Sequence, residues 1–328
     1  MASFGAFLHR QFFGSLPTPK ADLTGQTVIV TGSNTGLGRE AARHFVRLGA
    51  STVIIAVRST SKGDAAKADI EKSEGKTGVL QVWHLDMSSH QSVVDFAARV
   101  GKELDRVDIA ILNAGIGAGK WEVFADDESI ITVNVVSTFL LALSLLPKLV
   151  DTANKFNKRP TLSIVASDVH YWAKFKELSA PEGKLFEALN AKPQKVTDGF
   201  MMERYQVSKL MEVFGIRAIA DRKPAAQFPV TVNCCSPGLC HSEFARDGGI
   251  AFAIFKFFLA RSTEYGSRAL VHAGLSGPES HGHYQSEAAI QKPSDFVLSA
   301  EGYKAQDRVW RELSQKLEGI KPGVTSVV

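Results

Sequence analysis

Short apolar runs alternate with helical patterns along most of the chain, and this alternation is the feature that most restricts its fold. Continuous apolar strands separated by helices are typical of a parallel sheet that helices cover on both faces. Right-handed crossovers make such a sheet doubly wound. We therefore predict an α/β fold with a parallel sheet of about seven strands, at residues 27–31, 52–57, 79–85, 107–112, 161–166, 230–235 and 283–286. Helices are predicted at about residues 41–49, 64–73, 88–104, 126–149 and 201–222.

The predicted strands follow one another with no linker between them, which indicates a single domain. We place that domain at residues 25–290, with an N-terminal extension at 1–24 and a C-terminal helix and tail at 291–328. In the C-terminal part, Trp310 and Leu313 are the apolar residues expected to hold it against the domain.

Two long segments, 168–199 and 238–262, each follow a predicted strand. Ligands of open α/β sheets bind beyond the carboxyl ends of the strands, so these segments are predicted to form the walls of a substrate site. The first is either a lid or an extra surface helix. The second contains the run 250–259, with four phenylalanines, which is either a flap over a bulky apolar substrate or a helix packed on the core.

The composition excludes several classes of function. Lysine and arginine number 38 against 34 acidic residues, and the net charge of +4 is scattered, so nothing indicates nucleic acid. Cys234, Cys235 and Cys240 form no disulfide framework, which favours a reducing, cytoplasmic location. They are interpreted as buried strand residues. The histidines, including His281 and His283, lack metal-ligand spacing, and no metal is predicted.

Two other apolar segments bear on membranes. The uncharged run Ser129–Pro147 is 19 residues long, but its polar residues favour a helix buried in a protein core over a membrane span. Near the N-terminus, Phe4, Phe7, Leu8 and Phe12 have helical spacing, which leaves a weak peripheral membrane contact as an open alternative.

A glycine-rich turn, from Thr31 to Gly38, follows the first predicted strand. Such a turn lets the backbone approach a pyrophosphate, and the next helix offers unpaired N–H groups and a favourable dipole. The spacing is G-x-x-x-G-x-G. Asn113, Ala114 and Gly115 follow the fourth strand, where small residues allow a flat ring to approach. Either segment alone is equally consistent with a plain turn.

A second pattern, Tyr205 and Lys209, lies on a predicted helix. Residues four apart share one face, and an adjacent ammonium lowers the pKa of a phenol by favouring phenolate. Such a pair can act as a general acid and base between an alcohol and a carbonyl. Ser167 closes the fifth strand, where its hydroxyl could hold a substrate oxygen. Taken alone, the Tyr205 and Lys209 spacing is more typical of a solvated helix face, and Ser167 of an ordinary turn at a strand end.

The order of these motifs resembles the short-chain dehydrogenase/reductase family, which has a Rossmann fold. The resemblance covers about Gly25 to Tyr284. The residues in these motifs are most similar to those of the retinol-dehydrogenase-like branch, and they favour the fungal enzymes of secondary metabolism within it. The segments that carry it are TGSNTGLGRE, AVRS, LDMSS, LNAG, SIVAS, YQVSK and SPGLCHSEF.

The resemblance implies roles for individual residues. The catalytic set would be Ser167, Tyr205, Lys209 and Asn134, with Asn134 on a distorted helix that places a water near the lysine. Ser242 stands where the family usually has threonine, so its contact with the nicotinamide carboxamide is weaker evidence. Tyr205 and Lys209 would also contact the cofactor, Lys209 at the nicotinamide ribose. The other cofactor-binding positions would be Gly32, Ser33, Asn34, Gly36, Leu37 and Gly38 at the pyrophosphate, Asp86 at the adenine, Asn113, Ala114 and Gly115 beside the adenosine, and Pro237 and Gly238 behind the nicotinamide.

The end of the second strand indicates which cofactor is used. NAD-binding sheets usually end this strand with an acidic residue that bonds the ribose 2′-hydroxyl. This chain has Arg58 there instead, and a guanidinium suits a 2′-phosphate. The sequence therefore predicts NADP(H).

The sequence predicts an NADP(H)-dependent oxidoreductase that interconverts an alcohol and a ketone or aldehyde on a small but bulky apolar substrate, polyketide-, terpenoid- or retinoid-like. A monomer or a homodimer fits equally. Two alternatives stay open. A non-catalytic NADP(H)-binding scaffold or sensor would need no proton relay, and a sugar-nucleotide epimerase or dehydratase would carry a tighter glycine spacing and a larger C-terminal domain.

Overall fold

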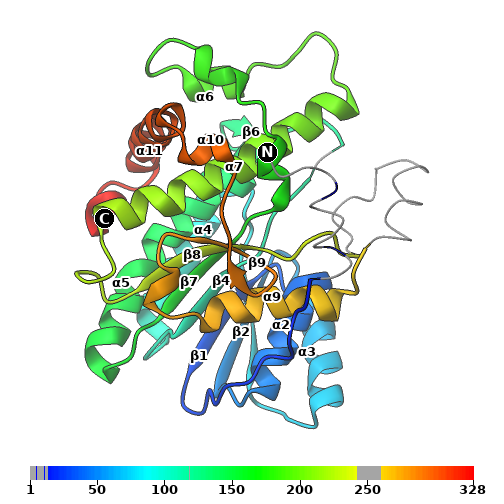
Figure 1. The fold of residues 1–328 in the computed structure, drawn as a ribbon. Helices are drawn as coiled ribbons and strands as arrows, with labels where there is room; N and C mark the ends of the chain where they lie inside the picture. Colours follow the sequence, from blue (N-terminus) through cyan, green and yellow to red (C-terminus); the bar gives the residue numbers. More distant parts are fainter. Residues whose placement is uncertain (1–4, 6–10, 12–13, 118, 242–259) are drawn as a thin grey trace.

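The computed structural model describes residues 5, 11, 14–117, 119–241 and 260–328. Its centre is an eight-stranded sheet with the order β10-β9-β8-β7-β4-β1-β2-β3 (Figure 1). The strands are β1 (Thr27–Thr31), β2 (Thr52–Val57), β3 (Leu80–His84), β4 (Ile109–Leu112), β7 (Thr161–Val165), β8 (Thr231–Ser236), β9 (Tyr284–Ser286) and β10 (Ala289–Ile290). The strands β2 and β3 are added on one side of β1, and the chain then crosses over so that β4 and the later strands are added on its other side, which makes the sheet doubly wound.

The predicted α/β fold is confirmed, because β1 to β4 and β7 to β9 pair in parallel at the predicted places. The sequence did not reveal β10, which pairs antiparallel with β9. The turn between these two strands is made by Glu287 and Ala288, both with positive φ. Neither is the glycine or asparagine that normally marks such a turn.

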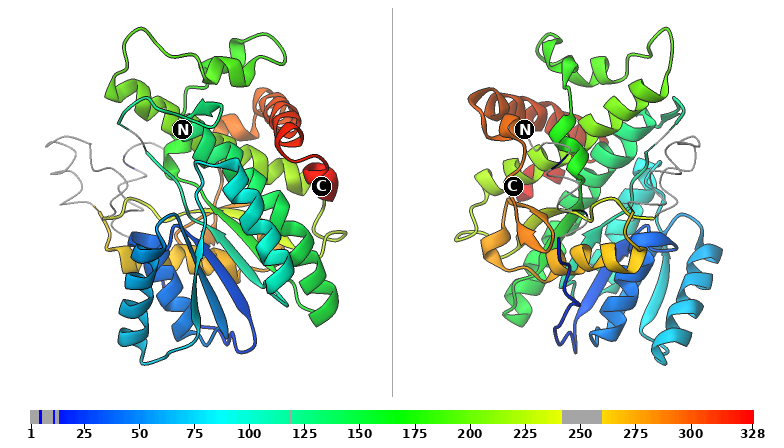
Figure 2. Two further views of the ribbon diagram at one scale, coloured as in Figure 1. Left: turned by 180° about the vertical axis from the view of Figure 1, so that it is seen from behind. Right: turned by 45° about the vertical axis from the view of Figure 1, so that its right-hand side comes forward.

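Helices cover both faces of the sheet (Figure 2). One face packs against α2 (Gly36–Arg47), α3 (Thr60–Glu74) and α9 (Thr263–Leu275). The other face packs against α4 (His90–Glu103), α5 (Thr138–Phe156) and α7 (Asp198–Arg222), with α11 (Ala300–Ile320) lying outside α7. The shorter helices are η1 (Ile131–Ser137), η2 (Asp168–Trp172), η3 (Lys176–Ser179), α6 (Leu185–Leu189), η5 (Pro278–Ser280), α10 (Asp295–Leu298) and η6 (Val324–Val327), and a hairpin joins β5 (Val123–Phe124) to β6 (Asp127–Glu128).

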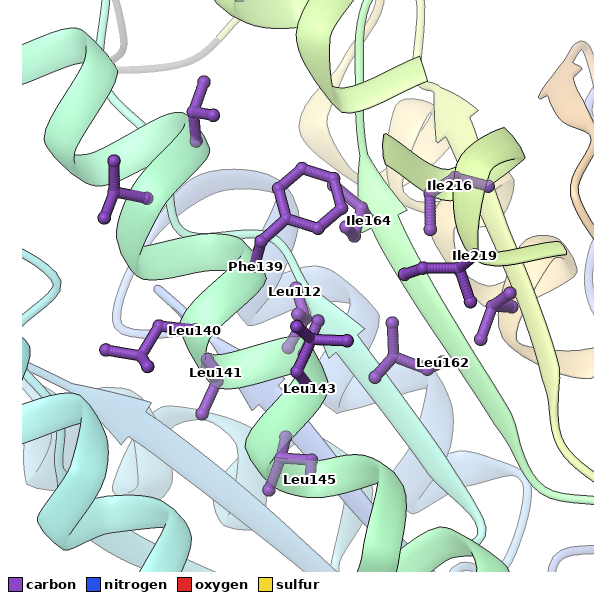
Figure 3. Packing of buried hydrophobic residues seen from close by; sticks show 14 of the residues in the cluster. Leu112, Phe139, Leu140, Leu141, Leu143, Leu145, Leu162, Ile164, Ile216 and Ile219 are labelled. Carbon is purple, nitrogen blue, oxygen red and sulfur yellow. The ribbon is translucent and has the colours of Figure 1, made fainter. Parts of the chain in front are cut away.

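The core on the α5 side is tightly packed around Phe139 (Figure 3). A Cβ added at Gly215 of α7 would lie 2.1 Å from the Phe139 ring, so only glycine lets the two helices approach this closely. The Trp310 ring of α11 meets Phe139 edge to face at 6.4 Å, and Leu313 is fully buried beside it. Burying each such large side chain stabilises the fold by about 1.5–3 kcal/mol.

The long apolar helix, residues 131–156, is mostly buried, because 78% of its most apolar stretch lies inside the protein. It is a core helix, as its polar residues predicted. It begins later than the sequence suggested, because Asp127 and Glu128 form β6. The Glu128 carboxylate then accepts hydrogen bonds from the N–H groups of Ile130 and Ile131, which caps the helix.

The segment 168–199 is fixed to α11 by side chains of that helix. Arg308 donates to the carbonyl oxygens of Leu178 and Pro181 at 2.8 and 2.7 Å, and Glu312 accepts from the N–H of Leu185 at 2.8 Å. Leu185 and Leu189 are fully buried. Of the two alternatives, these contacts favour an extra surface layer over a free lid. Figure 1 shows α6 at the top, beyond α7.

Candidate active site

The glycine-rich turn between β1 and α2 forms a cradle of bare backbone. Gly32 and Gly36 have φ of +64° and +58°, a region that favours glycine. A Cβ at Gly38 would lie 2.5 Å from Asn113 Nδ2 and 2.6 Å from the Gly32 carbonyl oxygen, so no side chain fits there. Thr35 provides no side-chain cap to α2. The first N–H groups of α2 can therefore bind an anion, which is what a pyrophosphate requires.

The other residues of this turn serve the framework. The Ser33 hydroxyl donates to the Val30 carbonyl oxygen at 2.7 Å, and the Leu37 side chain packs into the core. Asn34 is partly exposed at the turn. Only the backbone of Ser33 and Leu37 is thus placed to meet a ligand.

The end of β4 is tied to the end of β1. Asn113 Nδ2 donates to the carbonyl oxygens of Thr31 and Gly32 at 2.9 and 3.3 Å, and the Ala114 N–H donates to Thr31 Oγ1 at 2.9 Å. A Cβ at Gly32 would lie 3.0 Å from the Ala114 backbone. Asn113 and Ala114 therefore shape the cradle from behind.

Arg58 and Asp86 lie at the same edge, beyond the adjacent strands β2 and β3. Arg58 is exposed, and it makes no hydrogen bond or ion pair with the residues that the structure describes. Asp86 Oδ1 accepts from both the N–H and the hydroxyl of Ser88, at 3.0 and 2.7 Å. Arg58 thus presents an exposed cation, and Asp86 presents a carboxylate that Ser88 holds in a fixed orientation.

Ser167, Tyr205, Lys209 and Asn134 converge at the carboxyl ends of β4 and β7. The Ser167 hydroxyl lies near enough to the Tyr205 phenol to act on its pKa, which it lowers. Lys209, one turn further along α7, has its Nζ 5.8 Å from the centre of the Tyr205 ring. A Cβ at Gly115 would lie 3.2 Å from Asn134 Oδ1 and 3.7 Å from Lys209 Nζ, so both groups line the same small space.

Asn134 sits in the π-helical stretch η1, where the backbone departs from the regular α-helix. Its side chain exchanges two hydrogen bonds with the backbone of Ile116, each at 2.9 Å, and also donates to Ser208 Oγ at 3.1 Å. The widened turn leaves backbone groups that do not follow the α-helical pattern, and such π-bulges occur frequently at functional sites.

The electrostatics of Tyr205 differ from the sequence expectation. Burial raises the pKa of Tyr205 above its usual value, although the nearby charge of Lys209 acts to lower it. Glu212 opposes Lys209 and raises the pKa of Tyr205 further. The expected lowering by Lys209 is therefore present but outweighed. The sequence analysis missed Glu212, although its i+7 spacing from Tyr205 places it on the same helix face.

The turn after β8 is joined to the Ser167 segment by buried side chains that the sequence analysis also missed. Ser236 Oγ accepts from the N–H groups of Asp168 and Gly238, each at 3.2 Å. The Tyr284 hydroxyl donates to Asp168 Oδ1. Pro237 is buried and Gly238 has a φ of +74°. Ser236, Asp168 and Tyr284 lie far apart in the sequence, and no sequence pattern indicates that their side chains meet.

Some sequence predictions lie outside the described residues. These are the carboxamide contact of Ser242, the flap or core helix at 250–259, and the membrane contact of Phe4, Phe7, Leu8 and Phe12. The three cysteines are buried, and burial raises the pKa of Cys235 to about 12, so its thiol is protonated near neutral pH.

Comparisons with known proteins agree with this geometry. The family model described as short chain dehydrogenase matches residues 26–156. A short chain dehydrogenase/reductase, dmxR8, of the fungus Cryptosporiopsis is 55% identical over 98% of this chain and 99% of its own length. The short-chain dehydrogenase anuD of Penicillium roqueforti is 41% identical over 97% of this chain and 84% of its own.

Solved structures share the fold. An uncharacterised protein from Mycobacterium paratuberculosis has a TM-score of 0.67 at 24% identity, over 91% of this chain and 95% of its own. A short chain dehydrogenase from Shigella flexneri, solved in complex with NADP, has a TM-score of 0.59 at 20% identity, over 81% of this chain and 98% of its own.

Proposed function

This chain belongs to the short-chain dehydrogenase/reductase family of oxidoreductases, and we propose that it interconverts an alcohol and a ketone or aldehyde with NADP(H). The observation that carries the proposal is the grouping of four side chains: Lys209 Nζ lies 5.8 Å from the Tyr205 ring centre, Asn134 lines the same small space, and the Ser167 hydroxyl acts on the Tyr205 phenol. A pure binding protein needs no such set of proton-transfer groups. The backbone cradle at Gly38 and the uncapped start of α2 fit a dinucleotide.

The proposed roles follow from these positions. Ser167 orients the substrate oxygen, and Tyr205 donates a proton to it during reduction or removes one during oxidation. Lys209 stabilises the phenolate form of Tyr205. Asn134 holds the adjoining backbone and can connect Lys209 to solvent through a water. When bound, the nicotinamide cofactor supplies or accepts the hydride.

The choice of NADP(H) rests on Arg58. It is exposed beyond β2 with no partner in the described parts of the chain, and no acidic residue replaces it at the end of that strand. A free guanidinium is suited to a 2′-phosphate. A structural neighbour that was solved with NADP supports the choice.

The proposed substrate is bulky and apolar. We propose that the segment 168–199, which follows β7 at the carboxyl edge of the sheet, forms one wall of the substrate site, and that a second wall begins with 238–241, after β8. The fungal relatives favour a role in secondary metabolism. We propose one catalytic domain at residues 25–290, with the extension at 1–24 and the tail at 291–328 attached to it. The burial of Leu16, Leu23 and Leu313 supports that arrangement.

The test is NADPH oxidation with a panel of apolar ketones, together with the reverse reaction on the alcohols. In Tyr205→Phe, which keeps the ring but loses the ionisable oxygen, turnover should fall at least ~10²-fold. The Kd for NADPH should not change. Tyr303→Phe is the matched control, because Tyr303 is 47% exposed on α11. Turnover by Tyr205→Phe near the wild-type rate contradicts the mechanism. NADPH binding without turnover of any substrate by the wild type favours the scaffold alternative.

A further inference from the structure

Glu212 is a buried carboxylate on the helix face that carries the proposed catalytic pair. Tyr205, Lys209 and Glu212 have the spacing i, i+4 and i+7, which places them along one side of α7. The Glu212 side chain is 2% exposed. Its Oε1 accepts a hydrogen bond from Lys209 Nζ at 2.8 Å. Its Oε2 has no hydrogen-bond partner among the described residues.

Glu212 helps to fix the position of the Lys209 ammonium group. An ammonium has three N–H donors. One donates to the Val165 carbonyl oxygen at the end of β7 and another to Glu212, both at 2.8 Å. Within the described residues the third has no acceptor, and Nζ lies beside Gly115 at the site. Two fixed bonds therefore orient the third donor.

We propose that Glu212 is a positioning residue for Lys209: it holds the ammonium group in place and offsets part of the positive charge that Lys209 presents to Tyr205. This inference rests on the proposed roles of Lys209 and Tyr205. Glu212 itself does not need to touch the substrate or the cofactor.

The surroundings of Glu212 make its charge consequential. Lys209 and Tyr205 face it from its own helix, and Cys234 and Cys235 interact with it from β8. Burial raises the pKa of both thiols, so they stay neutral near pH 7. On β7, the groups beside Lys209 and Cys235 are the Val165 carbonyl and the Ser163 hydroxyl, which carry no charge.

The Glu212 carboxylate therefore acts mainly on the ammonium of Lys209. Burial raises the pKa of Glu212 to about 7, against the opposing effect of Lys209. Burial acts to lower the pKa of Lys209, but Glu212 and Tyr205 raise it above its usual value. Ionised Glu212 also raises the pKa of Tyr205. Removing its charge should therefore lower the pKa of both Tyr205 and Lys209.

The experiment uses Glu212→Gln in the full chain. Both limbs of the pH profile of alcohol oxidation should move to lower pH, the lower limb by about one pH unit, because Tyr205 ionises more easily. Glu212→Asp keeps the charge and should keep the wild-type limbs. Asp108→Asn is the matched control, since Asp108 is also a buried, ion-paired carboxylate but lies at the opposite edge of the sheet.

A second readout needs no turnover. The ultraviolet absorbance of phenolate is titrated in each protein, and the same titration in its Tyr205→Phe counterpart is subtracted. The pKa of Tyr205 should be lower in Glu212→Gln than in the wild type. If no carbonyl is reduced but this shift occurs, the proposed function fails and the inference on Glu212 stands.

Three outcomes overturn the inference. The first is a Tyr205 pKa that is the same in Glu212→Gln and wild type. The second is an equal shift in Asp108→Asn. The third is that neither Glu212→Gln nor Glu212→Met folds, which would make Glu212 a structural residue. Glu212→Met is used if Glu212→Gln does not fold, because it removes the same charge with an apolar side chain of similar volume.

Discussion

The Ser236 hydroxyl, at the end of β8, accepts a hydrogen bond from the backbone N–H of Asp168 at 3.2 Å. It also accepts from the N–H of Gly238 at 3.2 Å. Asp168 follows Ser167, and Gly238 belongs to the turn expected behind the nicotinamide. One buried hydroxyl thus fixes the distance between the serine that would hold the substrate and the turn that would support the cofactor.

Ser236→Ala should consequently lower kcat by about tenfold while the protein stays folded. The two N–H groups lose their shared acceptor, and small displacements of reacting groups slow catalysis strongly. The measurement is steady-state kinetics together with thermal unfolding. Ser163→Ala is the control, because Ser163 is also buried in a neighbouring strand, and its hydroxyl makes a long 3.9 Å contact with Cys235 Sγ rather than holding two backbone N–H groups. Equal losses in both variants would show a general packing effect.

Gly38→Ala should weaken cofactor binding. The new Cβ would lie 2.5 Å from Asn113 Nδ2 and 2.6 Å from the Gly32 carbonyl oxygen, so the cradle must open. We expect the Kd for NADPH, measured by fluorescence titration, to rise at least about tenfold.

Gly101→Ala provides the comparison for this substitution. Gly101 lies in α4 with nothing within 4 Å of the added Cβ, and alanine in a helix interior stabilises by about 0.5–1 kcal/mol. It should therefore raise the melting temperature and leave the Kd unchanged. A Kd for Gly38→Ala within twofold of wild type would refute the cradle.

Most of the sheet could be predicted from the sequence because strands such as β1, β2 and β4 are apolar on both faces and bounded by clear turn residues. Val53 to Val57, for example, are all buried. The exact start of the long apolar helix could not be predicted, because its apolar run continues through the π-helical stretch η1, which no residue type marks. The position of β10 depended on positive φ at Glu287 and Ala288, which the sequence does not signal.

The candidate site was predictable only where its residues are close in sequence or carry a family motif. Tyr205 and Lys209 lie on one helix, and Gly32 to Gly38 form one turn. By contrast, Ser236 reaches Asp168 across 68 positions and Tyr284 reaches it across 116. The balance between the burial of Tyr205 and the charge of Lys209 also needs the folded structure, because desolvation depends on what surrounds the phenol.

Arg58→Ala should weaken the binding of NADPH much more than that of NADH. The guanidinium is exposed at the end of β2 and has no partner in the described residues that would compete for it. Losing a charge-assisted contact with a 2′-phosphate should raise the Kd for NADPH at least about tenfold. The Kd for NADH should stay within about twofold. Arg99→Ala, another partly exposed arginine, on α4, is the control. Equal effects of Arg58→Ala on both cofactors would contradict the assignment.

Arg308→Ala should loosen the segment 168–199 from α11. The guanidinium holds the carbonyl oxygens of Leu178 and Pro181 and also pairs with Glu312 at 2.8 Å, and its side chain is only 13% exposed. Leaving these acceptors unpaired should lower the free energy of unfolding by about 1–3 kcal/mol. Because the segment is the proposed wall of the substrate site, the KM for bulky apolar ketones should rise more than the KM for small ones.

Arg311→Ala separates this effect from a general loss of charge on α11. Arg311 is 60% exposed and bonds Glu182 at the surface, so its removal should change stability by less than about 1 kcal/mol. Denaturant unfolding measures the change in the free energy of unfolding, and kinetics with a large and a small ketone measure the changes in KM. If Arg308→Ala loses stability but raises both KM values equally, the segment is a structural layer and the substrate binds elsewhere along the sheet edge. If the rise is confined to the large ketone, the segment forms its wall.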